Sequence, residues 1–187
     1  MADQGTEGIL SPCLRRKRIQ AATPYLRGRV LDVGCGGGIL ATLVDSKKYL
    51  GVEIDEISLQ KAKSTFPSHQ FSQSLPNAGE KFDTVVSLAV IEHVKDPVSF
   101  LRELAEFLRD DGRLVITTPH PSVDWVHHLG AEIGIFSKHA SEEHEDLLDK
   151  ARLEAAGAQA GLKLDLYARF LFGANQLAVY SKAVVCV

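Results

Sequence analysis

The chain has 187 residues, 45% of them hydrophobic and 24% charged, which is ordinary for one globular domain spanning residues 1–187. A net charge of −3 gives no overall field that would attract nucleic acid or an anionic membrane, and no apolar run approaches the roughly 20 residues of a transmembrane helix. Cys13, Cys35 and Cys186 are too few and too scattered for a disulfide framework or a zinc site, so we expect a cytoplasmic protein.

Strand-like and helical patterns alternate along the chain after a loose tail at 1–11, which favours an α/β fold with a parallel sheet between helices. Strands are predicted at 29–33, 48–53, 69–72, 82–87, 113–118, 162–170 and 174–184. Helices are predicted at 12–27, 38–46, 56–65, 97–109 and 141–156. Residues 119–140 break the pattern, and we interpret this His-rich stretch as a substrate lid.

The most informative stretch runs from Val30 to Gly38, where a buried strand leads into a glycine turn and a helix start. Such a turn lets a ligand approach backbone N–H groups at a helix N-terminus. The next strand ends at Glu53, 19 residues after Gly34, where a carboxylate can accept from both hydroxyls of a ribose. Together these features predict a nucleoside pocket.

The spacing of the glycines argues against a dinucleotide. A dinucleotide fingerprint needs a glycine at the sixth position counted from Gly34, and this chain has Ile39 there. Asp32, just upstream, would repel a pyrophosphate but suits the ammonium group of an amino acid. The predicted ligand is a nucleoside with a zwitterionic amino-acid tail, and an NAD-dependent enzyme is a distant alternative.

Three blocks, at 30–55, 82–97 and 108–119, together resemble the class I S-adenosylmethionine-dependent methyltransferases. They are most similar to the branch that contains ubiquinone-biosynthesis O-methyltransferases and other small-molecule methyltransferases. The resemblance implies a Rossmann-like, doubly wound, mostly parallel seven-stranded sheet with an antiparallel last strand. It also implies S-adenosylmethionine as the cofactor.

The resemblance assigns cofactor-binding roles to particular residues. The methionine moiety is assigned to Asp32, Gly34, Cys35, Gly36 and Gly38, with Ser87 and Leu88 from the end of the fourth strand. An arginine in the first helix, Arg16 or its neighbour Arg15, is expected to grip the methionine carboxylate. Glu53, followed by Ile54, should hold the ribose, whereas Asp55 is a better candidate for a helix N-cap. Relatives often hold adenine with an acidic residue; here Gln73 or Ser74 stands in that region.

Histidines near the site are candidates for the proton acceptor of a hydroxyl substrate. His93 follows the fourth strand and His120 follows the fifth, and either ring has a suitable pKa range, although a structural role for His93 is the other interpretation. Some relatives bind a metal here with a further Glu three residues before the Glu-His pair. This chain has Ala89 at that position, so we expect no metal.

The function expected from the resemblance is methyl transfer to a small-molecule acceptor, with oxygen as the nucleophile. A nucleic-acid methyltransferase is an alternative, but the chain lacks both the Asn/Asp-Pro-Pro-aromatic motif and a large basic patch, so no nucleic-acid partner is expected. A cofactor-binding protein without catalysis is the alternative from a different class. The sequence predicts neither the acceptor nor the oligomeric state.

Overall fold

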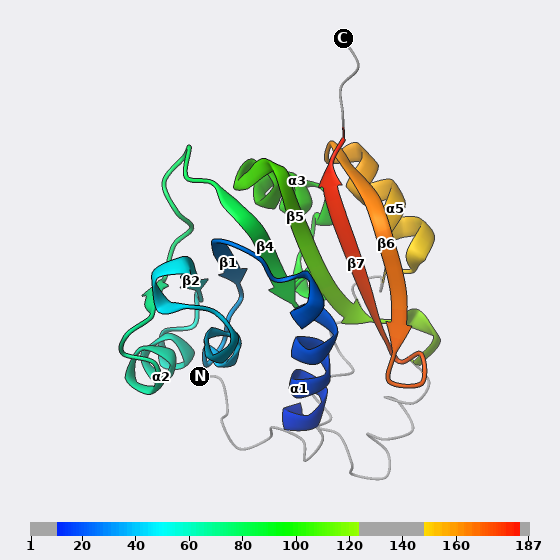
Figure 1. Cartoon of the computed structure of the whole chain (residues 1–187). Helices are drawn as coiled ribbons and strands as arrows, with labels where there is room; N and C mark the ends of the chain where they lie inside the picture. Colours follow the sequence, from blue (N-terminus) through cyan, green and yellow to red (C-terminus); the bar gives the residue numbers. More distant parts are fainter. Residues whose placement is uncertain (1–10, 124–147, 184–187) are drawn as a thin grey trace.

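A seven-stranded sheet forms the centre of the computed structural model, which describes residues 11–123 and 148–183 (Figure 1). Its strands are β1 (Val30–Val33), β2 (Tyr49–Val52), β3 (Gln70–Ser72), β4 (Phe82–Leu88), β5 (Leu108–Pro119), β6 (Leu162–Phe170) and β7 (Asn175–Lys182), in the order β3-β2-β1-β4-β5-β7-β6. Neighbouring strands are parallel, except that β7 is antiparallel to both β5 and β6. The predicted sheet with an antiparallel last strand is confirmed.

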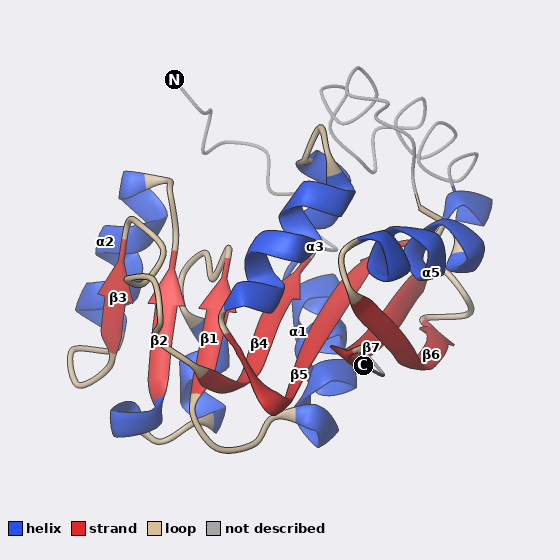
Figure 2. Ribbon diagram, turned by 90° about the horizontal axis from the view of Figure 1, so that it is seen from above, coloured by secondary structure: helices blue, strands red, loops and turns tan. Residues whose placement is uncertain are grey.

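Helices cover both faces of this sheet. They are α1 (Ser11–Ala22), α2 (Glu56–Thr65), α3 (Pro97–Glu106) and α5 (Lys150–Gln159). Figure 2 shows α3 and α5 on one face and α1 on the other. Each face has its own apolar core: Leu101, Leu104 and Leu153 belong to one, and Ala22 and Leu40 to the other. The sheet is therefore doubly wound. No helix within the described ranges has the length and apolar character that a membrane crossing needs.

The helix predicted at 38–46 is wrong. The chain forms two short 3-10 turns instead, η2 (Ile39–Leu43) and η3 (Ser46–Lys48). Gly38 enters η2 in the left-handed conformation with φ 76°, and the Thr42 hydroxyl donates back to the Ile39 carbonyl at 2.8 Å. Val44 is already extended. The β-branched residues at the end of the segment, which favour extended backbone, explain why no full helix follows β1.

Several other predicted boundaries also shift. The first helix ends at Ala22 and continues as the 3-10 turn η1 (Thr23–Tyr25), which contains Pro24. The helix predicted at 97–109 ends at Glu106, and β5 starts five residues earlier than its predicted start at 113. A continuous helix over 141–156 is wrong, because Asp149 is the N-cap of α5 and accepts from the Arg152 N–H at 2.8 Å. Residues 141–147, like 124–140 of the predicted lid, lie outside the described residues.

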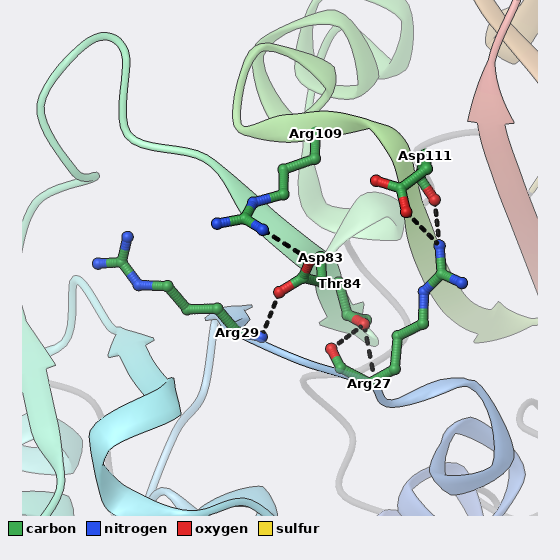
Figure 3. A network of polar contacts seen from close by, with 6 residues as sticks. All are labelled: Arg27, Arg29, Asp83, Thr84, Arg109 and Asp111. Atoms are coloured by element: carbon green, nitrogen blue, oxygen red, sulfur yellow. Dashed lines mark hydrogen bonds and ion pairs between the residues drawn. The ribbon is translucent and has the colours of Figure 1, made fainter.

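A polar network ties β1, β4 and β5 together at the amino-terminal edge of the sheet (Figure 3). The Asp83 carboxylate accepts from the Arg29 N–H at 2.6 Å and pairs with Arg109 at 3.2 Å. The Thr84 hydroxyl donates to the Arg27 carbonyl at 2.9 Å and accepts from the Arg27 N–H at 3.0 Å. These contacts lie at the opposite ends of the strands from the glycine turn, so they support the scaffold and leave the other edge for a ligand.

Candidate functional site

A pocket of about 400 Å³ opens where β1 and β4 end. Asp32, Gly34, Cys35, Gly36 and Leu88 line it, and all five are among the residues predicted to bind the cofactor. The remaining walls come from α1, α2 and η2, and from Ala89 beyond β4. The carboxyl edge of a parallel sheet is where doubly wound folds bind their ligands.

The other predicted cofactor residues, Glu53 among them, lie outside this lining. Ile54 is 81% exposed, and its carbonyl accepts from the Gln73 side-chain amide at 3.2 Å. Ser74 is exposed, Ser87 is buried near the end of β4, and Gly38 packs against the Phe71 ring. Their assignment to the cofactor stays a prediction.

The first helix contributes positive charge to the pocket, and Arg15, one of the two arginines that the sequence analysis named, is part of it. Arg15 and Arg18 line the pocket, together with Leu14 and Ile19, whereas Arg16 is exposed and lies outside the lining. Positions 14, 15, 18 and 19 share one helical face, which is the signal that would have identified them. Arg18 also contacts the start of β7, where its Nε donates to the Asn175 side-chain oxygen at 2.8 Å.

Asp32 is a buried carboxylate, only 3% exposed. The Tyr49 hydroxyl donates to its Oδ2 at 2.7 Å, a contact from the neighbouring strand β2 that the sequence did not reveal. Burial raises the pKa of Asp32 to about 7, and the negative charge of Glu53 adds to the rise, although the Tyr49 hydrogen bond opposes it. A buried carboxylate that costs this much to ionise gains strongly from a cationic ligand.

Glu53 connects the end of β2 to the glycine turn. Its Oε2 accepts from the Gly36 N–H at 2.8 Å, and its Oε1 accepts from the Asp55 N–H at 2.9 Å. Each carboxylate oxygen can accept more than one hydrogen bond, so one further acceptor position remains on each. The two positions match the two hydroxyls of a ribose.

The N–H groups of the glycine turn, which were expected to face a ligand, form hydrogen bonds within the protein instead. The Gly34 and Cys35 N–H groups both donate to the Val52 carbonyl, at 2.8 and 3.0 Å, and the Gly38 N–H donates to the Cys35 carbonyl at 2.9 Å. These N–H groups are therefore already used, and a ligand would contact the surface of the turn without receiving their hydrogen bonds. At Gly36, whose φ is 53°, no atom lies within 4 Å of the position a Cβ would take. This space and the two carboxylates fit a nucleoside with an ammonium-bearing tail.

Asp55 is the N-cap of α2, as predicted, and its carboxylate accepts from the Ser58 N–H at 2.8 Å. We expect Asp55→Ala to lower the free energy of unfolding by about 1 kcal/mol, because α2 loses a capped N–H group. Thermal unfolding measures this loss. Because the Asp55 carboxylate is engaged in capping α2, nucleoside affinity measured by calorimetry should stay unchanged, and a large affinity loss would show that Asp55 and not Glu53 holds the ribose.

Neither histidine proposed as a base lines the pocket. His93 ends the short turn η4 (Ile91–His93) and is exposed. His120 is half-buried, and its Nδ1 accepts from the Ser122 N–H at 3.0 Å. Burial and the nearby Arg169 lower the pKa of His120, with Asp149 opposing them. Their roles as proton acceptors stay predictions. Within the part of the chain that the structure describes, no three His, Cys, Asp or Glu side chains gather as a metal site.

Comparison with known proteins shows which family this chain belongs to. The profile described as "Methyltransferase domain" matches residues 11–167. A ubiquinone biosynthesis O-methyltransferase of Ruegeria pomeroyi is 32% identical over 127 residues, which cover 59% of this chain and 49% of the relative. A probable S-adenosylmethionine-dependent methyltransferase of Mycobacterium tuberculosis is 35% identical over 97 residues, covering 49% of this chain and 35% of the relative.

The chain spans between about a third and two thirds of the length of the curated relatives it matches. Among solved structures, magnesium protoporphyrin IX methyltransferase of Synechocystis, with bound S-adenosylhomocysteine, superposes with a TM-score of 0.71 at 18% identity, over 96% of this chain and 90% of that one. The fold is thus shared well beyond detectable sequence identity. The chain belongs to the methyltransferase domain family, and with it to the class I S-adenosylmethionine-dependent methyltransferases.

Proposed function

We propose that the protein transfers the methyl group of S-adenosylmethionine to an oxygen atom of a small-molecule acceptor. The observation that carries the proposal is the pair of carboxylates at the glycine turn: Asp32 lines the pocket with Gly36, and Glu53 accepts from the Gly36 N–H. Asp32 would hold the ammonium group and Glu53 the ribose hydroxyls. The bound sulfonium supplies an activated methyl group, while the protein aligns the acceptor and excludes water.

The preference for a small molecule and for oxygen is supported by the names of relatives such as the Ruegeria O-methyltransferase. The overall charge of −3, which gives no field that would attract nucleic acid, supports the same preference. The cytoplasmic location expected from the few cysteines stays a prediction. A cofactor-binding protein without catalysis is the second candidate, and it would bind the cofactor without producing S-adenosylhomocysteine.

Calorimetry with S-adenosylmethionine and S-adenosylhomocysteine tests the proposal on wild type and Glu53→Ala. We expect the variant to bind about 10- to 100-fold more weakly, because two hydrogen bonds to a charged group are lost. Glu103→Ala, which removes an exposed carboxylate of α3, is the matched control and should bind like wild type. No binding by the wild type would overturn the proposed function, whereas equal affinity of Glu53→Ala would overturn the ribose assignment alone.

A further inference from the structure

Tyr49, the first residue of β2, has a buried hydroxyl to which the proposed function assigns no role. The residue is only 2% exposed, and its hydroxyl lies 2.7 Å from Asp32 Oδ2 on the neighbouring strand β1. Burial and the negative charge of Asp32 raise the pKa of Tyr49, so the hydroxyl stays protonated and donates to the carboxylate. A buried carboxylate is costly unless it is hydrogen-bonded, and Tyr49 supplies a hydrogen bond to this one.

Gly51 gives the tyrosine side chain room to reach Asp32. The register pairs Asp32 with Gly51, and Tyr49 precedes Gly51 by two residues, so all three positions share one face of the sheet. A Cβ on Gly51 would lie 2.6 Å from Phe71 Cδ1 and 2.9 Å from Cys35 Sγ. Because glycine has no side chain, these groups pack closely there and the tyrosine side chain can extend from β2 toward β1.

Two neighbouring rings hold the tyrosine ring in place. His69 and Phe71 both meet it edge-on, with ring centroids 5.6 Å away and interplanar angles of 83° and 66°. His69 is itself anchored, since its Nε2 lies 3.1 Å from the Val44 carbonyl oxygen. Edge-to-face packing favours a defined orientation of each ring. The Tyr49 hydroxyl is therefore held at the carboxylate by contacts that do not depend on a ligand.

The Asp32 carboxylate has one oxygen engaged and one left for a ligand. Among residues 11–123 and 148–183, the side-chain donor that meets it is the Tyr49 hydroxyl, and the bond is made to Oδ2. Asp32 also lines the cofactor pocket, where Oδ1 is the oxygen that a ligand can use. Rotation of the carboxylate would break the hydrogen bond, so Tyr49 fixes which oxygen faces the ligand.

The other titratable groups around Asp32 come from the glycine turn, two helices and the end of β2. They are Cys35, Arg15 and Arg18 of α1, Lys61 of α2, and Glu53. Burial raises the pKa of the Cys35 thiol, so this group adds no charge. The negative charge of Glu53 disfavours a second negative charge on Asp32, whereas the Tyr49 hydrogen bond favours the ionised carboxylate.

We propose, resting on the methyl-transfer function above, that Tyr49 is a positioning residue for the cofactor: it holds Asp32 Oδ2 so that Oδ1 receives the ammonium group of S-adenosylmethionine. Tyr49 lies outside the pocket lining and acts through Asp32. Its hydrogen bond opposes the burial that raises the pKa of Asp32 to about 7. Without this donor, the carboxylate would be protonated over a wider range of pH and would attract the ammonium group less.

Calorimetry with S-adenosylhomocysteine at pH 8 and pH 6 tests the inference on wild type and Tyr49→Phe. The variant keeps the ring, and losing a hydrogen bond to a charged group shifts the ionisation equilibrium of the carboxylate by about tenfold. Because the pKa of Asp32 is about 7 in wild type, we expect the variant to bind about twofold more weakly at pH 8 and about tenfold more weakly at pH 6. A role in folding alone would lower affinity by the same factor at both pH values, and that result would overturn the inference.

Methylthioadenosine, a nucleoside without the amino-acid tail, is the second probe. Because it carries no ammonium group, Tyr49→Phe should bind it like wild type at both pH values. A loss of affinity for this probe would show that Tyr49 shapes the nucleoside part of the pocket, against the inference. Tyr180→Phe is the matched control, since it removes another buried hydroxyl, which donates to the Leu153 carbonyl at 3.0 Å outside the pocket lining. It should bind both ligands like wild type.

A double-mutant cycle separates an action through Asp32 from an independent one. In the Asp32→Asn background, Tyr49→Phe should change S-adenosylhomocysteine affinity by less than about twofold at either pH, because the charge that it supports is already gone. A further tenfold loss at pH 6 in this background would overturn the inference. Failure of wild type to bind both S-adenosylhomocysteine and methylthioadenosine would instead overturn the proposed function.

Discussion

Asp32→Asn is expected to weaken S-adenosylhomocysteine binding at pH 8 by at least about 100-fold. Removing one partner of a buried ion pair typically costs about 3–5 kcal/mol, because the remaining charge stays desolvated without compensation. Here the remaining charge is the ammonium group of the ligand. Calorimetry measures the loss, with Asp110→Asn as control, since Asp110 is a fully exposed carboxylate paired with Lys182 on another strand. An affinity within threefold of wild type would rule out Asp32 as the ammonium site.

The same carboxylate should make wild-type affinity depend on pH. The pKa of Asp32 in the free protein is raised to about 7, and the ammonium group binds the ionised form. Lowering the pH from 8 to 6 reduces the ionised fraction roughly tenfold, so affinity should fall by about the same factor. Asp32→Asn should show no such fall between these pH values. A wild-type affinity that is constant from pH 6 to 8 would contradict the raised pKa.

Gly34→Ala should destabilise the fold far more than Gly36→Ala. Both glycines have positive φ, at 75° and 53°, but a Cβ on Gly34 would lie 2.4 Å from Val90 Cγ2, whereas one on Gly36 meets no atom within 4 Å. We expect Gly34→Ala to lose about 3 kcal/mol or more from combined strain and overlap, and to melt on the order of 10 °C lower. Gly36→Ala should lose only about 1 kcal/mol, from the left-handed backbone alone.

For ligand affinity we expect the opposite order, with the larger effect in Gly36→Ala. The open space at Gly36 faces the pocket, so a methyl group there would occupy volume that the nucleoside needs. Gly36→Ala should therefore stay folded and lose most of its affinity for S-adenosylhomocysteine, measured by calorimetry. If Gly36→Ala binds normally, the ligand does not approach this glycine, and the proposed position of the nucleoside is wrong.

The sequence predicted the features that depend on residues close to one another in the chain. The sheet, the Asp55 cap and the pocket residues around Gly34 follow from strand patterns, capping chemistry and contiguous glycines. The contacts between distant segments did not follow. Tyr49 meets Asp32 across two strands, and Arg18, which the sequence analysis did not name, reaches the pocket from the same helix face as Arg15. Burial did not follow from the sequence either: Glu92 has an oxygen shielded from solvent, whereas the adjacent His93 is exposed. The failed helix after Gly38 shows that an apolar run alone does not distinguish an α-helix from a 3-10 turn.

The short η2 turn has a consequence for selectivity among the nucleotides of a cell. A long α-helix at this place would direct a row of aligned peptide dipoles at the ligand and attract phosphate. Five residues of 3-10 turn supply little of that field, while Asp32 and Glu53 contribute negative charge to the same space. A phosphate placed at the Gly36 turn would therefore meet these two carboxylates without a long helix dipole to offset them, which disfavours ATP and NAD at this position even though they carry the same adenosine. Discrimination of this kind depends on what the pocket repels as much as on what it binds.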